Sequence, residues 1–205
     1  MRDNSRSISG TLKRLEEAEQ LKLAGHNEEA LQILEMLLIE DPENISALEE
    51  IADNELSLDH YSRAATAAER AIALDPDSYT GHYILGFLQS VDQKWETAII
   101  HLKKANAIRP NNAEILRCLG WGLFHSGQRA KGIVTLERAL NLDSENPLTL
   151  CDLGVAYLQT RNFSKAKLLF DKALEFDPEN PKALECIKAM HKLEEVLAKG
   201  GEMSS

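Results

Sequence analysis

The chain has 205 residues, of which 43% are hydrophobic and 5% aromatic, and its formal net charge is −10. This charge argues against a nucleic-acid partner, because binding a phosphate backbone requires a basic face. The acidity is uneven: residues 1–78 hold seven Lys and Arg against eighteen Asp and Glu, whereas residues 79–205 are close to neutral. Alanine and leucine are abundant and β-branched residues are few, so we expect an all-α fold.

The N-terminal segment 1–10 is polar and lacks the apolar stretch of a signal peptide, so we expect a disordered tail and a cytoplasmic protein. The longest uncharged run, Tyr79–Val91, is shorter than the roughly 20 residues that cross a bilayer. We therefore expect no membrane insertion.

A turn motif recurs along the chain with a constant period. Five equivalent positions, each 34 residues from the next, are occupied by Pro42, Pro76, Pro110, Ser144 and Pro178. A fixed period of this length indicates a stacked-repeat architecture. We predict five repeats, at residues 11–44, 45–78, 79–112, 113–146 and 147–180.

Each predicted repeat has room for two helices of about 13 residues, and its last residue is suited to begin the next helix. These last residues are Asn44, Ser78, Asn112, Asn146 and Asn180. Their short side chains can accept a hydrogen bond from the free amides of the following helix. After the last repeat, 181–199 has apolar residues at helical spacing and is predicted to be a capping helix. Gly200 and Gly201 should end it and leave a tail over 200–205.

Small residues recur at two places that should bring the paired helices together. The eighth place of the repeats holds Ala18, Ala52, Gly86, Gly120 and Gly154, and the twentieth holds Ala30, Ala64, Ala98, Gly132 and Ala166. A third place, the twenty-seventh, is Ala in four repeats and Leu37 in the first. An aromatic residue stands early in the second helix in three repeats, as Tyr61, Trp95 and Phe163.

This pattern resembles the tetratricopeptide repeat (TPR) family, and the resemblance covers 11–180. The departures are Leu37, His82, Arg109 and Ser144, and the first repeat is the most divergent. The resemblance implies a right-handed superhelical solenoid of antiparallel helix pairs, whose first helices line a concave groove. The clamp of Lys, Asn and Arg with which chaperone-binding members hold a C-terminal carboxylate is absent in every register.

Aromatic and cationic residues gather at the groove places of the third and fourth repeats. They are Tyr83, Phe87, Arg117, Trp121 and Phe124. Spacings of three and four place side chains on one helix face, and one period separates Tyr83 from Arg117 and Phe87 from Trp121. Such a cluster has the composition of a binding hot spot, with Arg117 as its exposed cation. The alternative is that Phe87 and Phe124 turn into the core and only Trp121 is partly exposed.

The groove places of the first two repeats are acidic, with Glu19, Glu49 and Asp53. If these carboxylates form part of the binding surface, the segment that lies along it should carry basic residues at this end. The alternative is an ordinary solvated acidic face.

The sequence shows no arrangement of residues typical of an enzyme, and we expect neither catalytic residues nor a cofactor or metal. The six histidines are scattered, with no HExxH motif and no His–Cys ligand spacing. Cys118, Cys151 and Cys186 stand on equivalent helices without a CxxC pair, so small buried thiols are expected.

The sequence therefore favours a protein-interaction module that binds a segment of another protein, whose identity it does not reveal. Two alternatives stay open: a scaffold that associates with copies of itself, and a groove that holds a small apolar ligand.

Overall fold

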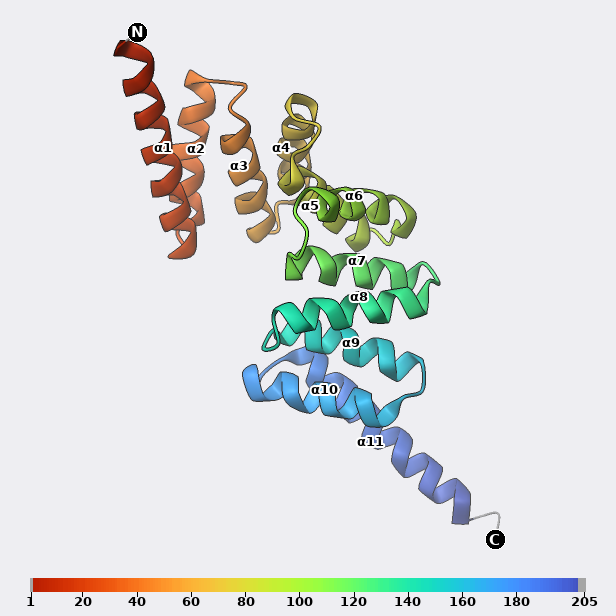
Figure 1. Cartoon of the computed structure of the whole chain (residues 1–205). Helices are drawn as coiled ribbons and strands as arrows, with labels where there is room; N and C mark the ends of the chain where they lie inside the picture. Colours follow the sequence, from red (N-terminus) through yellow and green to blue (C-terminus); the bar gives the residue numbers. More distant parts are fainter. Residues whose placement is uncertain (1, 203–205) are drawn as a thin grey trace. The chain divides into compact units, whose positions relative to one another are not determined.

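The computed structural model describes the backbone of residues 2–202 and the side chains of residues 10–192. All regular secondary structure in the described part is helical, which confirms the expected all-α fold (Figure 1). Over this part of the chain, no helix is both long enough and apolar enough to cross a membrane.

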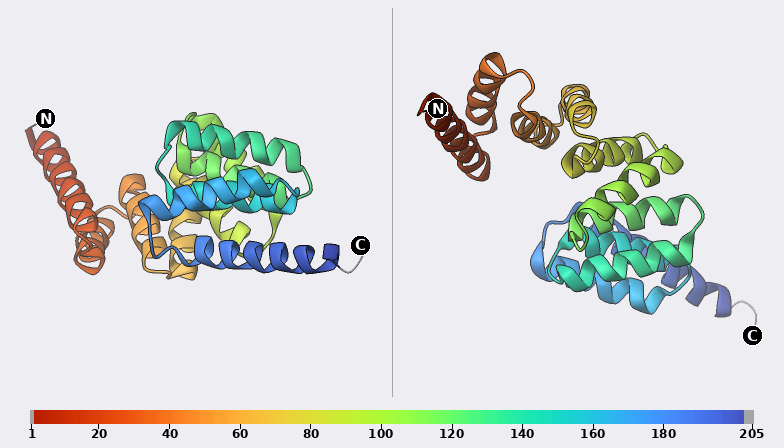
Figure 2. Two further views of the ribbon diagram at one scale, coloured as in Figure 1. Left: turned by 90° about the horizontal axis from the view of Figure 1, so that it is seen from below. Right: turned by 45° about the horizontal axis from the view of Figure 1, so that its top comes forward.

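The chain forms two compact units, Met1–Pro110 (unit 1) and Asn111–Ser205 (unit 2). The helices of unit 1 are α1 (Arg2–Leu23), α2 (Asn27–Glu40), α3 (Ile45–Ser57), α4 (Tyr61–Leu74), α5 (Tyr79–Val91) and α6 (Trp95–Ile108). Those of unit 2 are α7 (Ala113–His125), α8 (Arg129–Leu142), α9 (Pro147–Gln159), α10 (Phe163–Phe176) and α11 (Pro181–Glu202). The two helices of each successive pair run antiparallel, as Figures 1 and 2 show.

The predicted helix starts are confirmed by hydrogen bonds. The side-chain oxygens of the five predicted capping residues each accept from the backbone amide three residues later, at 3.0 Å in all five. Each bond satisfies an amide that would otherwise lack a partner at the start of α3, α5, α7, α9 or α11.

The turn inside each helix pair shares one backbone feature. A left-handed residue, with φ between 59° and 90°, stands at the fifteenth place of every predicted repeat. These residues are Gly25, Asp59, Gln93, Gly127 and Arg161. Only glycine adopts this conformation without steric cost, so three of the five turns hold a residue under mild strain.

The small residues lie where the paired helices meet, as predicted. Ala18, Ala52, Ala64 and Ala98 are fully or almost fully buried, and the glycines at the same places leave too little room for a side chain. A Cβ atom built on Gly132 of α8 would lie 2.6 Å from the backbone nitrogen of Phe124 on α7. Separate apolar cores fill unit 1 and unit 2.

Both ends of the chain differ from the prediction. The backbone of residues 2–10, expected to be disordered, continues α1, because the segment holds no proline and a single glycine costs only about 1 kcal/mol in a helix. At the other end, α11 runs through Gly200 and Gly201 to Glu202 instead of ending at 199 (Figure 2). Ala183 and Met190 are buried against unit 2, whereas the side chains of Leu193 and Leu197 lie outside the described residues.

Candidate functional site

The first-helix face of unit 1, on α3 and α5, carries four of the predicted binding residues. Glu49 of α3 is half-buried, and its Oε1 accepts a hydrogen bond from the Oγ of Ser78 at 2.5 Å. Burial raises the pKa of Glu49, and the bond from Ser78 only partly opposes this shift. The carboxylate is thus tied to the cap of α5.

Asp53, one turn along α3, is half-buried and forms an ion pair with Lys22 of α1. The same ammonium lies 3.5 Å from Glu50, so one cation serves two carboxylates. Glu19 of α1 is exposed. The predicted acidic surface is therefore present but partly neutralised by a residue of the same chain.

Tyr83 and Phe87 stand four residues apart on α5, and both are half-buried. Their ring centroids lie 6.4 Å apart with the planes tilted by 43°. Tyr83 also packs against the core of unit 1. The two rings form an aromatic pair with one side in the protein and the other in solvent.

In unit 2, the prediction that Arg117 is an exposed cation is wrong. Its side chain is 12% exposed, and its Nε and Nη2 donate to Glu114 at 2.9 and 2.5 Å. Its Nη1 donates to Asp152 of α9 at 2.7 Å. These hydrogen bonds to carboxylates raise the pKa of Arg117 despite its burial. The guanidinium of Arg117 is therefore paired with carboxylates of the same chain.

Trp121, on α7, is half-buried and stands between two other side chains. The Nζ of Lys182, from α11, lies 4.4 Å from the centre of its ring, within the range of a cation–π contact. The ring centroid of His125 lies 4.2 Å from that of Trp121 in an edge-on arrangement. Burial lowers the pKa of this histidine. Lys182 also donates to Asp152 at 2.6 Å.

The predicted position of Phe124 on the groove surface is wrong as well. Its side chain is 2% exposed and belongs to the core of unit 2. Because Gly132 has no side chain, α8 approaches α7 closely at Phe124, and the ring is enclosed. Of the alternatives considered, Phe124 alone has turned into the core, while Phe87 stays half-buried.

The structure therefore joins Tyr83 to Phe87 in unit 1 and links Arg117 to Trp121 through Asp152 and Lys182 in unit 2. The expected placement of Tyr83 beside Arg117, and of Phe87 beside Trp121, involves both units and stays a prediction.

Sequence reasoning overlooked the roles of Asp152 and Lys182. Asp152 comes one period plus one residue after Arg117, and Lys182 comes thirty residues after Asp152. An arginine with an acidic residue at that spacing was a usable sign of a structural ion pair.

The three cysteines are free thiols that lie wholly or partly inside the fold. Cys118 and Cys151 are buried free thiols and Cys186 is partly buried, as expected. Burial raises the pKa of Cys151 to about 11. Among the described residues, no cluster of three or more His, Cys, Asp and Glu is placed to hold a metal ion.

Comparison with known proteins identifies the repeats. Two tetratricopeptide repeat family models match the chain, over residues 49–113 and 147–180. The curated Transcriptional regulator HilA of Salmonella typhimurium is 26% identical over 125 residues, which are 57% of this chain. The chain spans only 23% of the length of that protein and of its Salmonella typhi counterpart.

Solved structures show the same fold. A thermophilic TPR protein from Thermus thermophilus superposes with a TM-score of 0.68 at 24% identity, covering 87% of this chain and 97% of that one. YrrB, a TPR protein, gives 0.63 at 20% identity, covering 90% and 97% of the two chains. MamA of Desulfovibrio magneticus RS-1 gives 0.64 at 22% identity, covering 82% and 94%. With the period of 34, the capped helix pairs and both family matches, the chain belongs to the tetratricopeptide repeat family.

Proposed function

We propose that this protein is an interaction module that holds a segment of another protein on the first-helix face of unit 1. The observation that carries the proposal is the aromatic pair of Tyr83 and Phe87 on α5, half-buried and tilted toward each other. Rings anchored by the core lose little conformational freedom when a partner covers them, and such residues are common in binding hot spots.

The charge next to this pair indicates the polarity of the segment. Glu50 and Asp53 share one cation, Lys22, and Glu19 and Glu49 add two further carboxylates, so α1 and α3 present an excess of negative charge. A segment with basic residues toward α1 and α3, and bulky apolar residues over Tyr83 and Phe87, complements this surface. Because exposed charges are screened by salt, the carboxylates should act mainly on the association rate.

Trp121 is a second candidate anchor, in unit 2. Lys182 covers one face of its ring, and Arg117 is held by Glu114 and Asp152. A partner would therefore find an aromatic side chain here but no unpaired guanidinium. YrrB is described as a TPR protein with an unusual peptide-binding site. That description is of YrrB alone, but it supports peptide recognition as a use of this fold.

The test is to identify a partner by affinity capture and measure its affinity for the purified variants. Tyr83→Ala with Phe87→Ala should weaken binding by about 2 kcal/mol or more. Trp121→Ala tests the second anchor. The control is Tyr61→Ala, a 39% exposed aromatic residue on α4, a second helix. A partner that ignores Tyr83 and Phe87 but responds to Tyr61 would overturn the proposal.

Two further measurements separate the alternatives. A protein that forms larger species as its concentration rises, and loses them in the Tyr83→Ala and Phe87→Ala variant, would instead be a scaffold of its own copies. A small apolar molecule that co-purifies and is seen by native mass spectrometry would favour a ligand-binding groove.

A further inference from the structure

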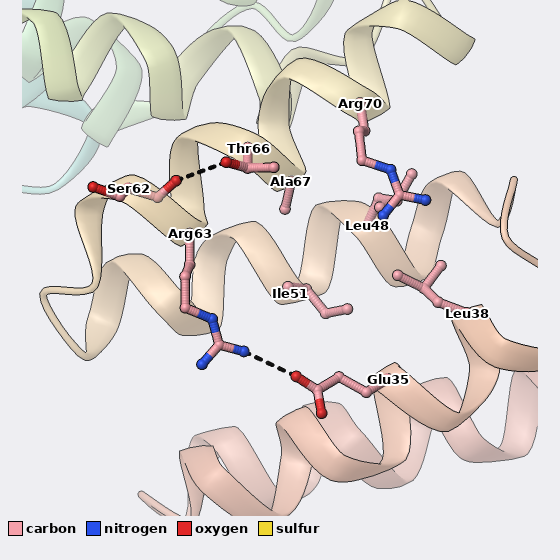
Figure 3. A pocket seen from close by; sticks show the side chains of 9 residues that line it. All are labelled: Glu35, Leu38, Leu48, Ile51, Ser62, Arg63, Thr66, Ala67 and Arg70. Carbon is pink, nitrogen blue, oxygen red and sulfur yellow. Dashed lines mark hydrogen bonds and ion pairs between the residues drawn. The ribbon is translucent and has the colours of Figure 1, made fainter.

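A hollow of about 380 Å³ lies in unit 1, between α2 and α4 and over α3 (Figure 3). Its floor is apolar and its rim is polar. The floor is made of Leu38, Leu48, Ile51 and Ala67, and the rim of Glu35, Ser62, Arg63, Thr66 and Arg70. The floor residues Leu48 and Ile51 lie on the opposite face of α3 from Glu49 and Asp53, by the helical period. The hollow is therefore distinct from the surface of the proposed function.

Ala67 is the smallest of the residues that line the hollow. Ala67 occupies the twenty-third place of its repeat, and the other four repeats hold a larger residue there: Ile33, His101, Thr135 and Leu169. A larger side chain at this place of α4 would fill the space above Ile51. The apolar surface also continues along α2, because Ile39 stands one turn after Glu35 on the same side of the helix and is 73% exposed.

The two arginines of the rim differ in their charge balance. Arg63 lies 2.9 Å from Glu35 and 2.7 Å from Glu55, whose side chain is fully buried, so its charge is compensated. Arg70 donates to the backbone carbonyl of Pro42 at 3.0 Å and forms no ion pair with any described residue. Figure 3 shows Ile51 between the guanidinium groups of Arg63 and Arg70. One end of the hollow is thus neutral overall, and the other is cationic.

We propose that this hollow is a second binding site, which takes a bulky apolar side chain from a partner peptide that also carries an acidic residue. The apolar side chain would cover Leu38, Leu48 and Ile51, because burying this surface is the main available driving force. The carboxylate would pair with Arg70, which has unused donors and no balancing charge. A basic residue would gain nothing at Arg70 and would be repelled by it.

The experiment uses the full-length chain and two synthetic peptides, acetyl-Glu-Leu-Trp-Leu-Glu-amide and the same peptide with Lys in place of Glu. Binding is followed by backbone amide shifts in NMR spectra. The acidic peptide should shift signals over residues 35–39 and 62–70, and the basic peptide should bind at least about tenfold more weakly.

Three variants sharpen the test. Ala67→Ile, which introduces the residue that stands at this place in the first repeat, should abolish binding without lowering the unfolding midpoint. Arg70→Glu should reverse the preference between the two peptides. The matched control is Arg138→Glu, at the same place of α8, which should change nothing; Arg138 is exposed and donates to Asn111.

Several results would overturn the proposal. They are no shifts with the acidic peptide at millimolar concentration, equal binding of the basic peptide, or binding that survives Ala67→Ile. Shifts confined to α5 would also overturn it and assign the peptide to the first-helix face. The Tyr83→Ala and Phe87→Ala variant should still bind the acidic peptide, so this site and the proposed function can fail independently.

Discussion

The first helices of the two units use equivalent places of the repeat in different ways. In unit 1, the fifth and ninth places hold Glu49 and Asp53 on α3 and Tyr83 and Phe87 on α5, all half-buried. In unit 2, the same two places on α7 hold Arg117 and Trp121. Arg117 is enclosed by carboxylates from α7 and α9, and Trp121 is covered by Lys182 of α11. The same places therefore form part of the proposed binding surface in unit 1 and of an internal ion network in unit 2.

This difference shows that the place of a residue in a repeat does not decide whether its charge is available. The deciding factor is the residue that the next helix brings to it. Asp152 of α9 has a side chain that is 6% exposed, and such a buried carboxylate needs its cations. Asp53 and Lys22 are more exposed and can exchange their contact for water at little cost.

The largest expected effect comes from removing the centre of the network in unit 2. Asp152→Ala should leave Arg117 and Lys182 without their shared partner and lower the unfolding free energy of unit 2 by about 3 kcal/mol. Trp121 fluorescence during urea unfolding, in a Trp95→Phe background, measures this. The matched control is Asp53→Ala in unit 1, followed by the fluorescence of Trp95 in a Trp121→Phe background; because the side chain of Asp53 is 35% exposed, its loss should cost less than about 1 kcal/mol. Equal losses from both variants would contradict the comparison.

A second prediction compares helix contacts in the two units. A Cβ added at Gly132 would lie 2.6 Å from a backbone nitrogen of Phe124, which cannot move without moving α7. At Gly86 of unit 1, the nearest atom is the Cγ of Leu102, also at 2.6 Å; this side chain is fully buried, but it can move without moving a helix backbone. Alanine gains about 1 kcal/mol of helix propensity at both positions.

The sum of these effects differs between the two sites. Gly132→Ala should therefore destabilise unit 2 by roughly 1–2 kcal/mol, whereas Gly86→Ala should destabilise unit 1 by a smaller amount. Thermal unfolding followed by circular dichroism compares the two variants with the wild type. A larger loss at Gly86 than at Gly132 would show that the side chain of Leu102 is less adaptable than the backbone of α7.

The third prediction concerns pH and is specific to unit 1. His82 of α5 is almost buried, and its Nε2 donates to the carbonyl of Pro76 at 3.2 Å. Its Nδ1 must then accept the hydrogen bond from Nδ1 of His101, 2.9 Å away on α6. Burial lowers the pKa of both histidines, and the charge of nearby Lys104 adds to this.

The sign of the effect follows from these lowered pKa values. The folded state favours neutral histidines, so the unfolded chain binds protons first as the pH falls. The stabilising contribution of the neutral histidines is fully present above the ordinary histidine pKa of about 6.5. The unfolding free energy should therefore decline by roughly 1 kcal/mol between pH 7 and pH 5. His82→Leu places at this position the residue found at the same place of α3, α7 and α9, and it should reduce this decline. Urea unfolding at both pH values measures it; an unchanged decline would assign the pH dependence to other groups.

The smallest effect is expected at Glu49. Because burial raises its pKa, the folded state holds the proton more tightly than the unfolded chain does. Its contribution is therefore most favourable at low pH and is lost as the pH rises through the raised pKa. Glu49→Gln keeps an acceptor for Ser78 without the charge, so it should add a few tenths of a kcal/mol at about pH 7. A loss of stability at this pH would mean that the charge on Glu49 strengthens the cap of α5.

Local features of the fold could be predicted from sequence, whereas the partners of the site could not. Asn44 and Ser78 mark helix starts because the hydrogen bond that caps a helix spans only three residues. Whether Arg117 is exposed or paired depends instead on Asp152, which lies on a different helix and in the next repeat. Phe124 was misplaced for a similar reason, since its burial depends on the missing side chain of Gly132. The hollow over α3 was missed because a single alanine, Ala67, ranks as an ordinary small residue until its neighbours are known.

The left-handed residue at the fifteenth place of every repeat restricts the insertions and deletions that such a chain can tolerate during evolution. Between this residue and the cap at the end of the repeat, each second helix has a fixed number of residues in which to place its buried side chains. Deleting one residue would rotate every later side chain on that helix by about 100° and turn its apolar face outward. Substitutions leave the number of residues in each second helix unchanged, whereas insertions and deletions do not. We therefore expect related proteins to differ in length by whole repeats. Insertions of any other length should be tolerated mainly before the first helix or after the last.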